Sequence, residues 1–170
     1  MEKMELMNTI FLGIITSFVA SIVFTYLFTR LKPNLKISDE IAFRNGTFKI
    51  KIINESKYAA TNIKADISYI GYFNVPGGRE RRSYRIDLQK DTLFDIDKFE
   101  KKSEHANNTY RFVTLENLRD GLNQNNYEYI RFKITATHSL SNIGKVFEKQ
   151  YNVSQITNGE FAFGNITTIS

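Results

Sequence analysis

One short stretch of the chain holds the residues best suited to bind a ligand. The stretch RERRSYR follows a Pro-Gly-Gly turn and mixes four arginines with one aromatic ring: Arg79, Arg81, Arg82, Tyr84 and Arg85. A guanidinium group binds phosphate oxygens through paired hydrogen bonds, and a tyrosine ring can stack on a nucleobase. This arginine cluster therefore predicts a site for an anionic nucleotide or oligonucleotide.

The arginine cluster also has two other interpretations. Because side chains alternate between the faces of a strand, neighbouring arginines would point in opposite directions. Charged residues also occur on edge strands simply to prevent aggregation. A contact with lipid headgroups and a plain solvated edge strand therefore remain alternatives to a nucleotide site.

No other residues have the types and spacing of a catalytic or metal site. His105 and His138 have no partner at a recurring metal-binding spacing, and we expect both to be ordinary surface residues. The chain has no cysteine, which excludes catalytic thiols and disulfides. It also has no glycine-rich phosphate loop and no serine nucleophile motif. We therefore expect a protein that is not an enzyme and that carries no metal or cofactor.

An apolar stretch near the N-terminus predicts a membrane anchor. Residues 10–28 contain no charged side chain and would form a helix of about 28 Å, enough for one bilayer crossing. The stretch is longer than a signal-peptide core and lacks a small-residue cleavage site, so we expect it to be retained. The predicted segments are a short N-terminus (1–9), a transmembrane helix (10–29), a juxtamembrane linker (30–36) and a β domain (37–170).

The charges beside this stretch predict its orientation. One lysine and two glutamates precede it, whereas three basic residues follow it before the first acid, Asp39: Arg30, Lys32 and Lys36. Basic residues stay on the cytoplasmic side, so we expect the N-terminus outside and the β domain in the cytoplasm, at a bacterial inner membrane. The net charge of +5 would suit an anionic lipid surface or a nucleotide ligand.

Small residues recur every four positions along the apolar stretch: Gly13, Ser17, Ser21 and Thr25. Small side chains let membrane helices approach closely, and hydroxyls can bond across the interface. This small-residue stripe predicts a homo-oligomer, a tetramer or larger, in which the stripe packs helices together or lines a narrow pore. The simpler interpretation is that serine, threonine and glycine are ordinary in membrane helices.

Alternating apolar and polar residues after the anchor predict strands, most clearly at 47–53, 62–70 and 127–138. The segment FKIKIINESKYAATNIKADISYI resembles the opening strands of bacterial immunoglobulin-like domains. A short helix is expected at 114–121, with Thr114 as its N-cap and Gly121 at its end. The prediction is a mainly β domain, an immunoglobulin-like sandwich or partly closed barrel of about seven to nine strands.

The layout of one anchor, one β domain and no catalytic motif resembles the membrane effectors of bacterial anti-phage defence systems. Effectors of that kind that sense cyclic oligonucleotides usually have two membrane helices, whereas one is expected here, and the effectors of the Hailong system are nearer in layout. The resemblance implies an ion channel or pore controlled by a nucleotide or oligonucleotide from a partner nucleotidyltransferase. The competing expectation is a membrane-anchored scaffold whose β domain binds a protein partner.

Overall fold

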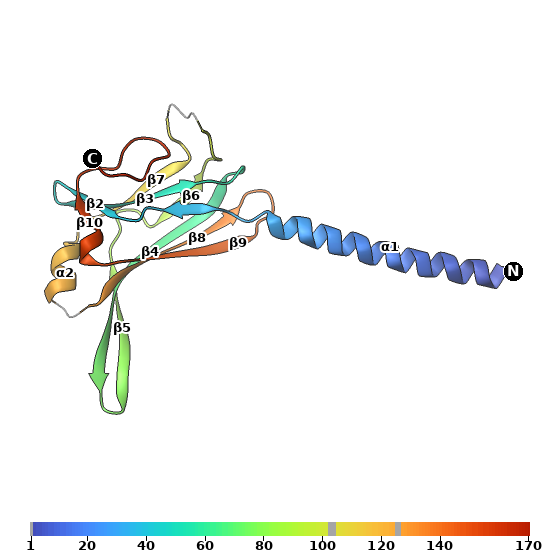
Figure 1. Ribbon diagram of the computed structural model, residues 1–170, viewed down its shortest axis with the longest axis horizontal. Coiled ribbons are helices and arrows are strands. Elements are labelled where there is room, and N and C mark those ends of the chain that lie inside the picture. The colour runs from blue at the N-terminus through green and yellow to red at the C-terminus, as the bar shows by residue number, and fades with distance from the viewer. Residues whose placement is uncertain (1, 102–104, 125–126) are drawn as a thin grey trace.

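A computed structural model describes residues 2–101, 105–124 and 127–170. Figure 1 shows a long N-terminal helix that leads into a β-sandwich, from which one hairpin projects. The helices are α1 (Glu2–Arg30), α2 (Leu118–Gln124) and the short 3-10 helix η1 (Val153–Gln155). The strands are β1 (Leu35–Ile37), β2 (Ile41–Arg44), β3 (Thr47–Asn54), β4 (Ala60–Val75), β5 (Gly78–Ile86), β6 (Thr92–Ile96), β7 (Thr109–Thr114), β8 (Tyr129–His138), β9 (Gly144–Tyr151) and β10 (Ile156–Asn158). The predicted mainly β fold with one N-terminal helix and a second short helix is confirmed.

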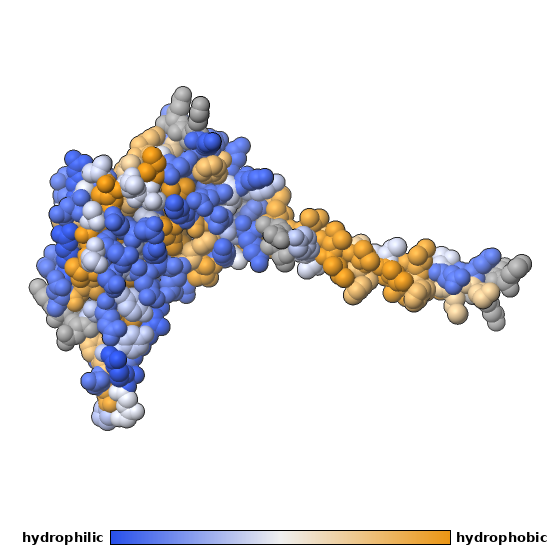
Figure 2. All heavy atoms as spheres, viewed as in Figure 1, coloured by the Kyte–Doolittle hydropathy of each residue, from blue (hydrophilic) through white to orange (hydrophobic). Residues whose placement is uncertain are grey.

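The first helix, α1, is apolar on every side. Its segment Met7–Phe28 is long and apolar enough to cross a membrane, and none of it is buried against the domain. Figure 2 shows this hydrophobic rod beside a largely hydrophilic domain. Water would not stabilise such a surface, so α1 fits a single membrane span. The first strand begins at Leu35, inside the stretch predicted to be a linker.

Within the described residues, ten strands form two five-stranded sheets, slightly more strands than predicted. In sheet A, β3 is central: β1 and β2 pair along one of its edges and β7 along the other, while β10 pairs with β2 in parallel. In sheet B, β4 is central, with β8 and then β9 on one side and β5 and β6 on the other. The shortest strands are β1, β2 and β10, whose sequences are too brief to show a clear alternation.

The core lies between the two sheets. Alternate residues of β3 and β7 face it from sheet A, and Ile52 and Phe112 are almost fully buried there. Ile67 and Phe132 face them from sheet B, and the rings of Phe112 and Phe132 lie 5.6 Å apart. Removing these side chains from water is the main force that holds the two sheets together.

The central strand of sheet B, β4, is much longer than the predicted strand at 62–70. It continues to Val75, turns through Pro76 and Gly77, and returns as β5. Gly77 has a φ angle of 94°, a backbone conformation that glycine adopts without strain. The outer part of this β4–β5 hairpin projects beyond the sandwich, roughly crosswise to α1 in Figure 1. The arginine cluster therefore lies on a protruding ribbon.

The predicted helix at 114–121 is displaced toward the C-terminus. Thr114 ends β7 instead of capping a helix, and its hydroxyl donates to the Asp87 carbonyl oxygen at 2.6 Å. Helix α2 begins at Leu118, where the Asn117 side chain accepts a hydrogen bond from the Asp120 amide. Gly121 lies inside this helix and does not end it. Glycine suits the position because a Cβ atom there would come within 2.2 Å of the Tyr69 hydroxyl oxygen.

The prediction that His138 is a surface residue is wrong. Its side chain is buried at the end of β8, with its ring 5.0 Å from the ring of Tyr58. Its Nδ1 atom accepts long hydrogen bonds from the amides of Leu140 and Ser141, and burial lowers its pKa below 6.5. His138 therefore has a structural role in the β8–β9 turn.

The C-terminal hairpin, residues 160–170, covers the outer face of sheet A. Alternation along β3 would leave Lys51 in water, yet Lys51 is fully buried beneath this hairpin. Its Nζ atom donates to three carbonyl oxygens of the hairpin, at distances of 2.6 to 2.8 Å: those of Ala162, Gly164 and Ile166. Burial lowers the pKa of Lys51 to about 8.

Candidate anion-binding face

The β4–β5 hairpin separates the predicted arginine cluster onto two faces. Paired residues of antiparallel strands share a face, so Arg79, Arg81 and Arg85 lie on the outer face of sheet B with Asn74, Tyr72 and Ser68. Arg82 and Tyr84 lie on the opposite face, paired with Gly71 and Tyr69. The sequence grouped these five residues correctly on one hairpin, but the structure brings only three of the arginines onto a common face.

Further basic residues extend this outer face across the sheet. On β8, Arg131 pairs with Ser68 and Lys133 pairs with Asp66, which places both side chains on the outer face. Lys64 of β4 pairs with Thr135 of β8 and shares the same face. The resulting basic face, as we call it below, contains six cationic side chains from three adjacent strands: Lys64, Arg79, Arg81, Arg85, Arg131 and Lys133.

Several arginines of the hairpin already have carboxylate partners. Arg79 Nη2 lies 3.3 Å from Glu128 Oε1, and the Arg82 guanidinium donates twice to Glu80 on the opposite face. Among the described residues, Arg81 has no ion pair. Exposed ion pairs contribute about 0–1 kcal/mol each, so a multiply charged anion can compete for these arginines.

Two tyrosines lie on the basic face among the arginines. Tyr72 is opposite Arg81 across the hairpin, and Tyr129 pairs with Ile70 in the adjoining strand. Burial raises the pKa of Tyr129, and a side-chain hydrogen bond with Tyr72 raises it further. The Arg79 guanidinium lies 5.6 Å from the centre of the Tyr72 ring. Aromatic rings beside phosphate-binding cations are typical of surfaces that bind single-stranded nucleic acid.

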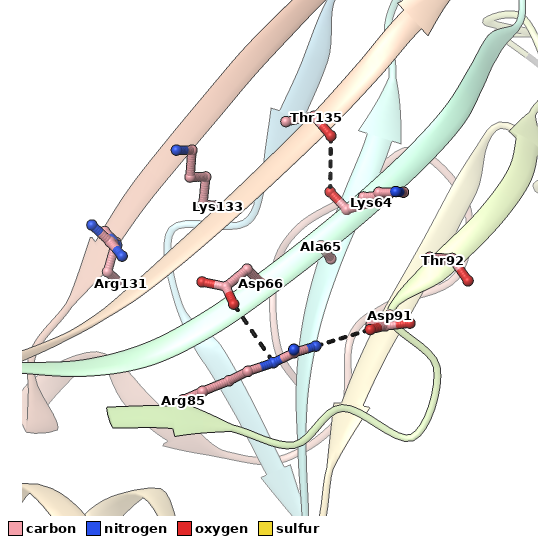
Figure 3. A pocket seen from close by; sticks show the side chains of 9 residues that line it. All are labelled: Lys64, Ala65, Asp66, Arg85, Asp91, Thr92, Arg131, Lys133 and Thr135. Carbon is pink, nitrogen blue, oxygen red and sulfur yellow. Dashed lines mark hydrogen bonds and ion pairs between the residues drawn. The ribbon is translucent and has the colours of Figure 1, made fainter. Parts of the chain in front are cut away.

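A pocket of about 500 Å³ lies on the basic face at the base of the hairpin. Figure 3 shows Arg85 between two carboxylates: its Nη2 atom lies 2.9 Å from Asp91 Oδ2, and its Nε atom lies 3.8 Å from Asp66 Oδ1. Arg131 and Lys133 extend from β8, on the other side of β4 (Figure 3). Four cations and two carboxylates thus line the pocket, which leaves it with a net positive charge.

Nothing in the sequence pattern links Lys64, Arg131 and Lys133 with the arginine cluster. Their alternation with apolar residues identified them only as the water-facing side of strands. The grouping depends on which strands become neighbours, and the paired residues Ser68 and Arg131 are 63 positions apart in the chain. The spacing of basic residues at every second position, as in Arg131 and Lys133, was the available signal.

The small-residue stripe lies along one side of α1. Gly13, Ser17 and Ser21 line a shallow groove with Ile10, Ile14 and Phe18, and Thr25 continues the same side one turn later. The Ser21 hydroxyl donates to the Ser17 carbonyl oxygen at 2.8 Å. This hydroxyl therefore has its hydrogen bond within the helix. The stripe would favour contact with a neighbouring helix because its side chains are small and let the two backbones approach closely.

A metal centre finds no support in the described residues, where no group of three histidine, cysteine, aspartate or glutamate side chains could hold an ion. No protein-family model matches the chain, and a search of curated proteins found no match to it.

Proposed function

We propose that this protein is an oligomeric membrane effector whose β domain binds an anionic nucleotide or oligonucleotide on the basic face. Helix α1 anchors each copy in a bacterial inner membrane, with the N-terminus outside and the β domain in the cytoplasm. Binding controls a narrow pore formed by the helices, and the biological setting is anti-phage defence with a partner nucleotidyltransferase. The observation that carries the proposal is the basic face, with six cations and two tyrosines on one sheet of a domain joined to an apolar helix.

The side chains of the basic face favour a nucleotide or oligonucleotide as the ligand. Guanidinium groups favour phosphate oxygens, and Tyr72 and Tyr129 offer ring surfaces for bases. The cations run from Arg79, near the tip of the hairpin, to Lys64 near the start of β4. A row of about ten residues along β4, at about 3.3 Å each, suits an extended chain of phosphates better than a single small ion.

The small residues and uncharged span of α1 support a pore. One helix cannot enclose a passage, so a pore requires several copies that pack through their small residues. Gly13 has open space around the position of a Cβ atom, which leaves its backbone accessible to a second helix. The span contains no acidic or basic side chain, so the passage would be narrow and lined by hydroxyl and apolar groups.

A binding experiment tests the ligand class. Full-length protein in mild detergent is titrated against a fluorescent, mixed-sequence single-stranded DNA, and anisotropy reports the affinity. We expect binding that weakens as salt rises, because phosphate contacts release counterions. Replacing Arg79, Arg81 and Arg85 by glutamine should reduce the affinity at least about tenfold.

The control for this experiment removes the same charge elsewhere, by replacing Lys36, Arg44 and Lys57 with glutamine. These side chains lie outside the basic face, two on sheet A and one in the turn after it. An equal loss of affinity in both variants would show non-specific attraction and contradict the proposal. Failure of the unmodified protein to bind DNA would favour the membrane-anchored scaffold that binds a protein partner.

A further inference from the structure

We propose that the pocket at the base of the hairpin binds a terminal phosphate group, the end of a nucleotide or oligonucleotide. This inference rests on the proposed ligand class and adds which part of the ligand the pocket takes. A terminal phosphate carries more charge and more free oxygens than the diester groups along a strand. A concave pocket lined by cations from several strands suits such a group, whereas the open hairpin suits the strand itself.

The pocket contains more positive charge than its carboxylates neutralise. Both carboxylates, Asp66 and Asp91, are directed to Arg85. Within the described part of the chain, the other three cations of the pocket have no ion pair: Lys64, Arg131 and Lys133. These three side chains remain available to an anion from outside.

Arg131 carries the strongest sign of a missing partner. Its Nε atom is buried and has no hydrogen-bond acceptor in the structure. Buried polar atoms nearly always have a partner, and an unsatisfied one calls for an explanation such as a ligand. A guanidinium binds phosphate through two parallel N–H groups, one of which can be Nε. The Nε atom is covered in this conformation, so the Arg131 side chain would have to turn toward a phosphate in the pocket to give this atom a partner.

Arg85 supplies a second guanidinium at the same pocket. Its contacts with Asp91 at 2.9 Å and Asp66 at 3.8 Å are largely exposed to water. Exposed pairs are weak, so Arg85 can turn toward a phosphate without a large loss. Arg85 also belongs to the hairpin strand, which joins the pocket to the rest of the basic face.

The position of the pocket favours a nucleotide end over a lipid headgroup. The β8–β9 turn marks the membrane side of the domain, because Ser141 Oγ donates to the carbonyl oxygen of Leu31 at the end of α1. Arg131 precedes His138, at the end of β8, by seven residues, which is about 23 Å along the strand. Tyr129 lies on the same strand and face, where a base next to a terminal phosphate could stack.

The test compares two single-stranded DNAs of the same sequence, one ending in a phosphate and one in a hydroxyl. Each carries its fluorescent label at the opposite end and is titrated against the full-length protein in mild detergent. We expect the phosphate end to increase affinity about tenfold, a typical effect of hydrogen bonds to a charged group. Arg131→Gln should abolish that difference, because it should weaken binding of the phosphate-ended DNA far more than binding of the hydroxyl-ended DNA.

Two further variants complete the comparison. Arg44→Gln removes an equal charge from sheet A and should keep the preference for the phosphate end. Lys133→Gln keeps Arg131 intact and should reduce the preference for the phosphate-ended DNA. It therefore tests the pocket even if Arg131→Gln does not fold. Inorganic phosphate, titrated by calorimetry, should bind to the unmodified protein and not to Arg131→Gln.

The outcomes separate this inference from the proposed function. Equal affinity for both DNAs, or a preference that survives in both Arg131→Gln and Lys133→Gln, would overturn the terminal-phosphate site and leave the basic face intact. If the unmodified protein bound neither DNA, both proposals would be overturned. Arg131-dependent binding to vesicles that contain phosphatidic acid, without binding to either DNA, would assign the pocket to a lipid headgroup and overturn the nucleotide end.

Discussion

Lys51 is a fully buried cation of sheet A. Its ammonium group lies within 2.8 Å of three carbonyl oxygens, and those oxygens belong to the C-terminal hairpin. A buried ammonium is stable only when its protons are matched by acceptors, and here three protons meet three acceptors. Lys51 therefore joins sheet A to the C-terminal hairpin and is a structural residue, not part of the basic face.

Lys51→Met should destabilise the domain by about 3 kcal/mol, because it keeps the bulk of the side chain but leaves three carbonyl oxygens without their donor. Urea denaturation of the full-length protein in detergent, followed by tyrosine fluorescence, measures the change. Lys57→Met is the matched control, since Lys57 is exposed in the turn after β3. A loss of similar size in both variants would contradict this role of Lys51.

Glu160 holds the start of the same hairpin. It accepts a hydrogen bond from Lys49, and its carboxylate also contacts Arg44. The hydrogen bond from Lys49 and the charges of Lys49, Arg44 and Arg111 lower the pKa of Glu160 below its ordinary value of 4.5. Ionised Glu160 therefore stabilises the docked hairpin above about pH 4.5, and this contribution is lost as the pH falls through the lowered pKa.

An NMR titration of the Glu160 carboxyl group in the full-length protein measures this effect. We expect a midpoint below 4.5, and Lys49→Met should move the midpoint upward toward that value because it removes the principal partner. A midpoint at or above 4.5 in the unmodified protein would show that the ion pairs of Glu160 do not hold the hairpin.

The basic face could be predicted from sequence only where its residues are adjacent in the chain. The arginine cluster was visible as RERRSYR, and its alternation between two faces was expected. Arg131 and Lys133 were not linked to it, because a strand pattern shows which residues face water and not which strand lies beside it. Lys51 shows the same limit, since the segment that buries it is more than one hundred residues away.

At the scale of elements, close packing of α2 against β4 depends on Gly121. A Cβ atom at this position would lie 2.2 Å from the Tyr69 hydroxyl oxygen. Alanine normally stabilises a helix by about 1 kcal/mol relative to glycine, but here the overlap with Tyr69 should dominate. We expect Gly121→Ala to destabilise the domain by about 1–3 kcal/mol in urea denaturation.

Gly144→Ala is the control for Gly121→Ala. A Cβ atom at Gly144 would make only ordinary contacts, the shortest at 3.7 Å to Thr137. Its effect should stay within about 0.5 kcal/mol. Equal stability of the unmodified protein and Gly121→Ala would show that α2 shifts freely and does not pack tightly on Tyr69.

Helix α1 was the element best predicted from sequence, because a long uncharged run has few alternatives. The helix extends further than the predicted 10–29, back to Glu2, since nothing in MEKMELMNT stops a helix. Helix α2 was displaced because Thr114 suits a strand end as well as an N-cap, and its hydroxyl bonds Asp87 instead. Thr114 is part of β7 because it pairs with Phe48 of β3.

The small-residue stripe is tested by making it bulky. Ser17→Leu with Ser21→Leu should reduce the assembly in mild detergent to monomers, because large side chains keep helix backbones apart. Light scattering on the purified full-length protein measures the mass. Ile15→Leu with Val19→Leu changes the opposite side of α1 and should leave the assembly unchanged. An unchanged mass in the stripe variant would contradict packing through this face.

For the whole molecule, the arrangement of parts limits how a signal could reach the membrane. The β1 strand follows α1 after a few residues, and the Ser141 contact with Leu31 fastens the β8–β9 turn to the same junction. Strand β8 also contributes Arg131 and Lys133 to the pocket. In the proposed function, a ligand bound at Arg131 would be linked to the end of α1 through strand β8 and the β8–β9 turn.

The most direct test of the central claim is ion conductance across a planar bilayer that contains the full-length protein. Current is recorded before and after adding mixed-sequence single-stranded DNA to the side that holds the β domain. We predict a conductance that changes on addition of DNA, with no change in the variant lacking Arg79, Arg81 and Arg85. No conductance in either condition, or a conductance that DNA does not alter, would contradict an effector controlled through the basic face.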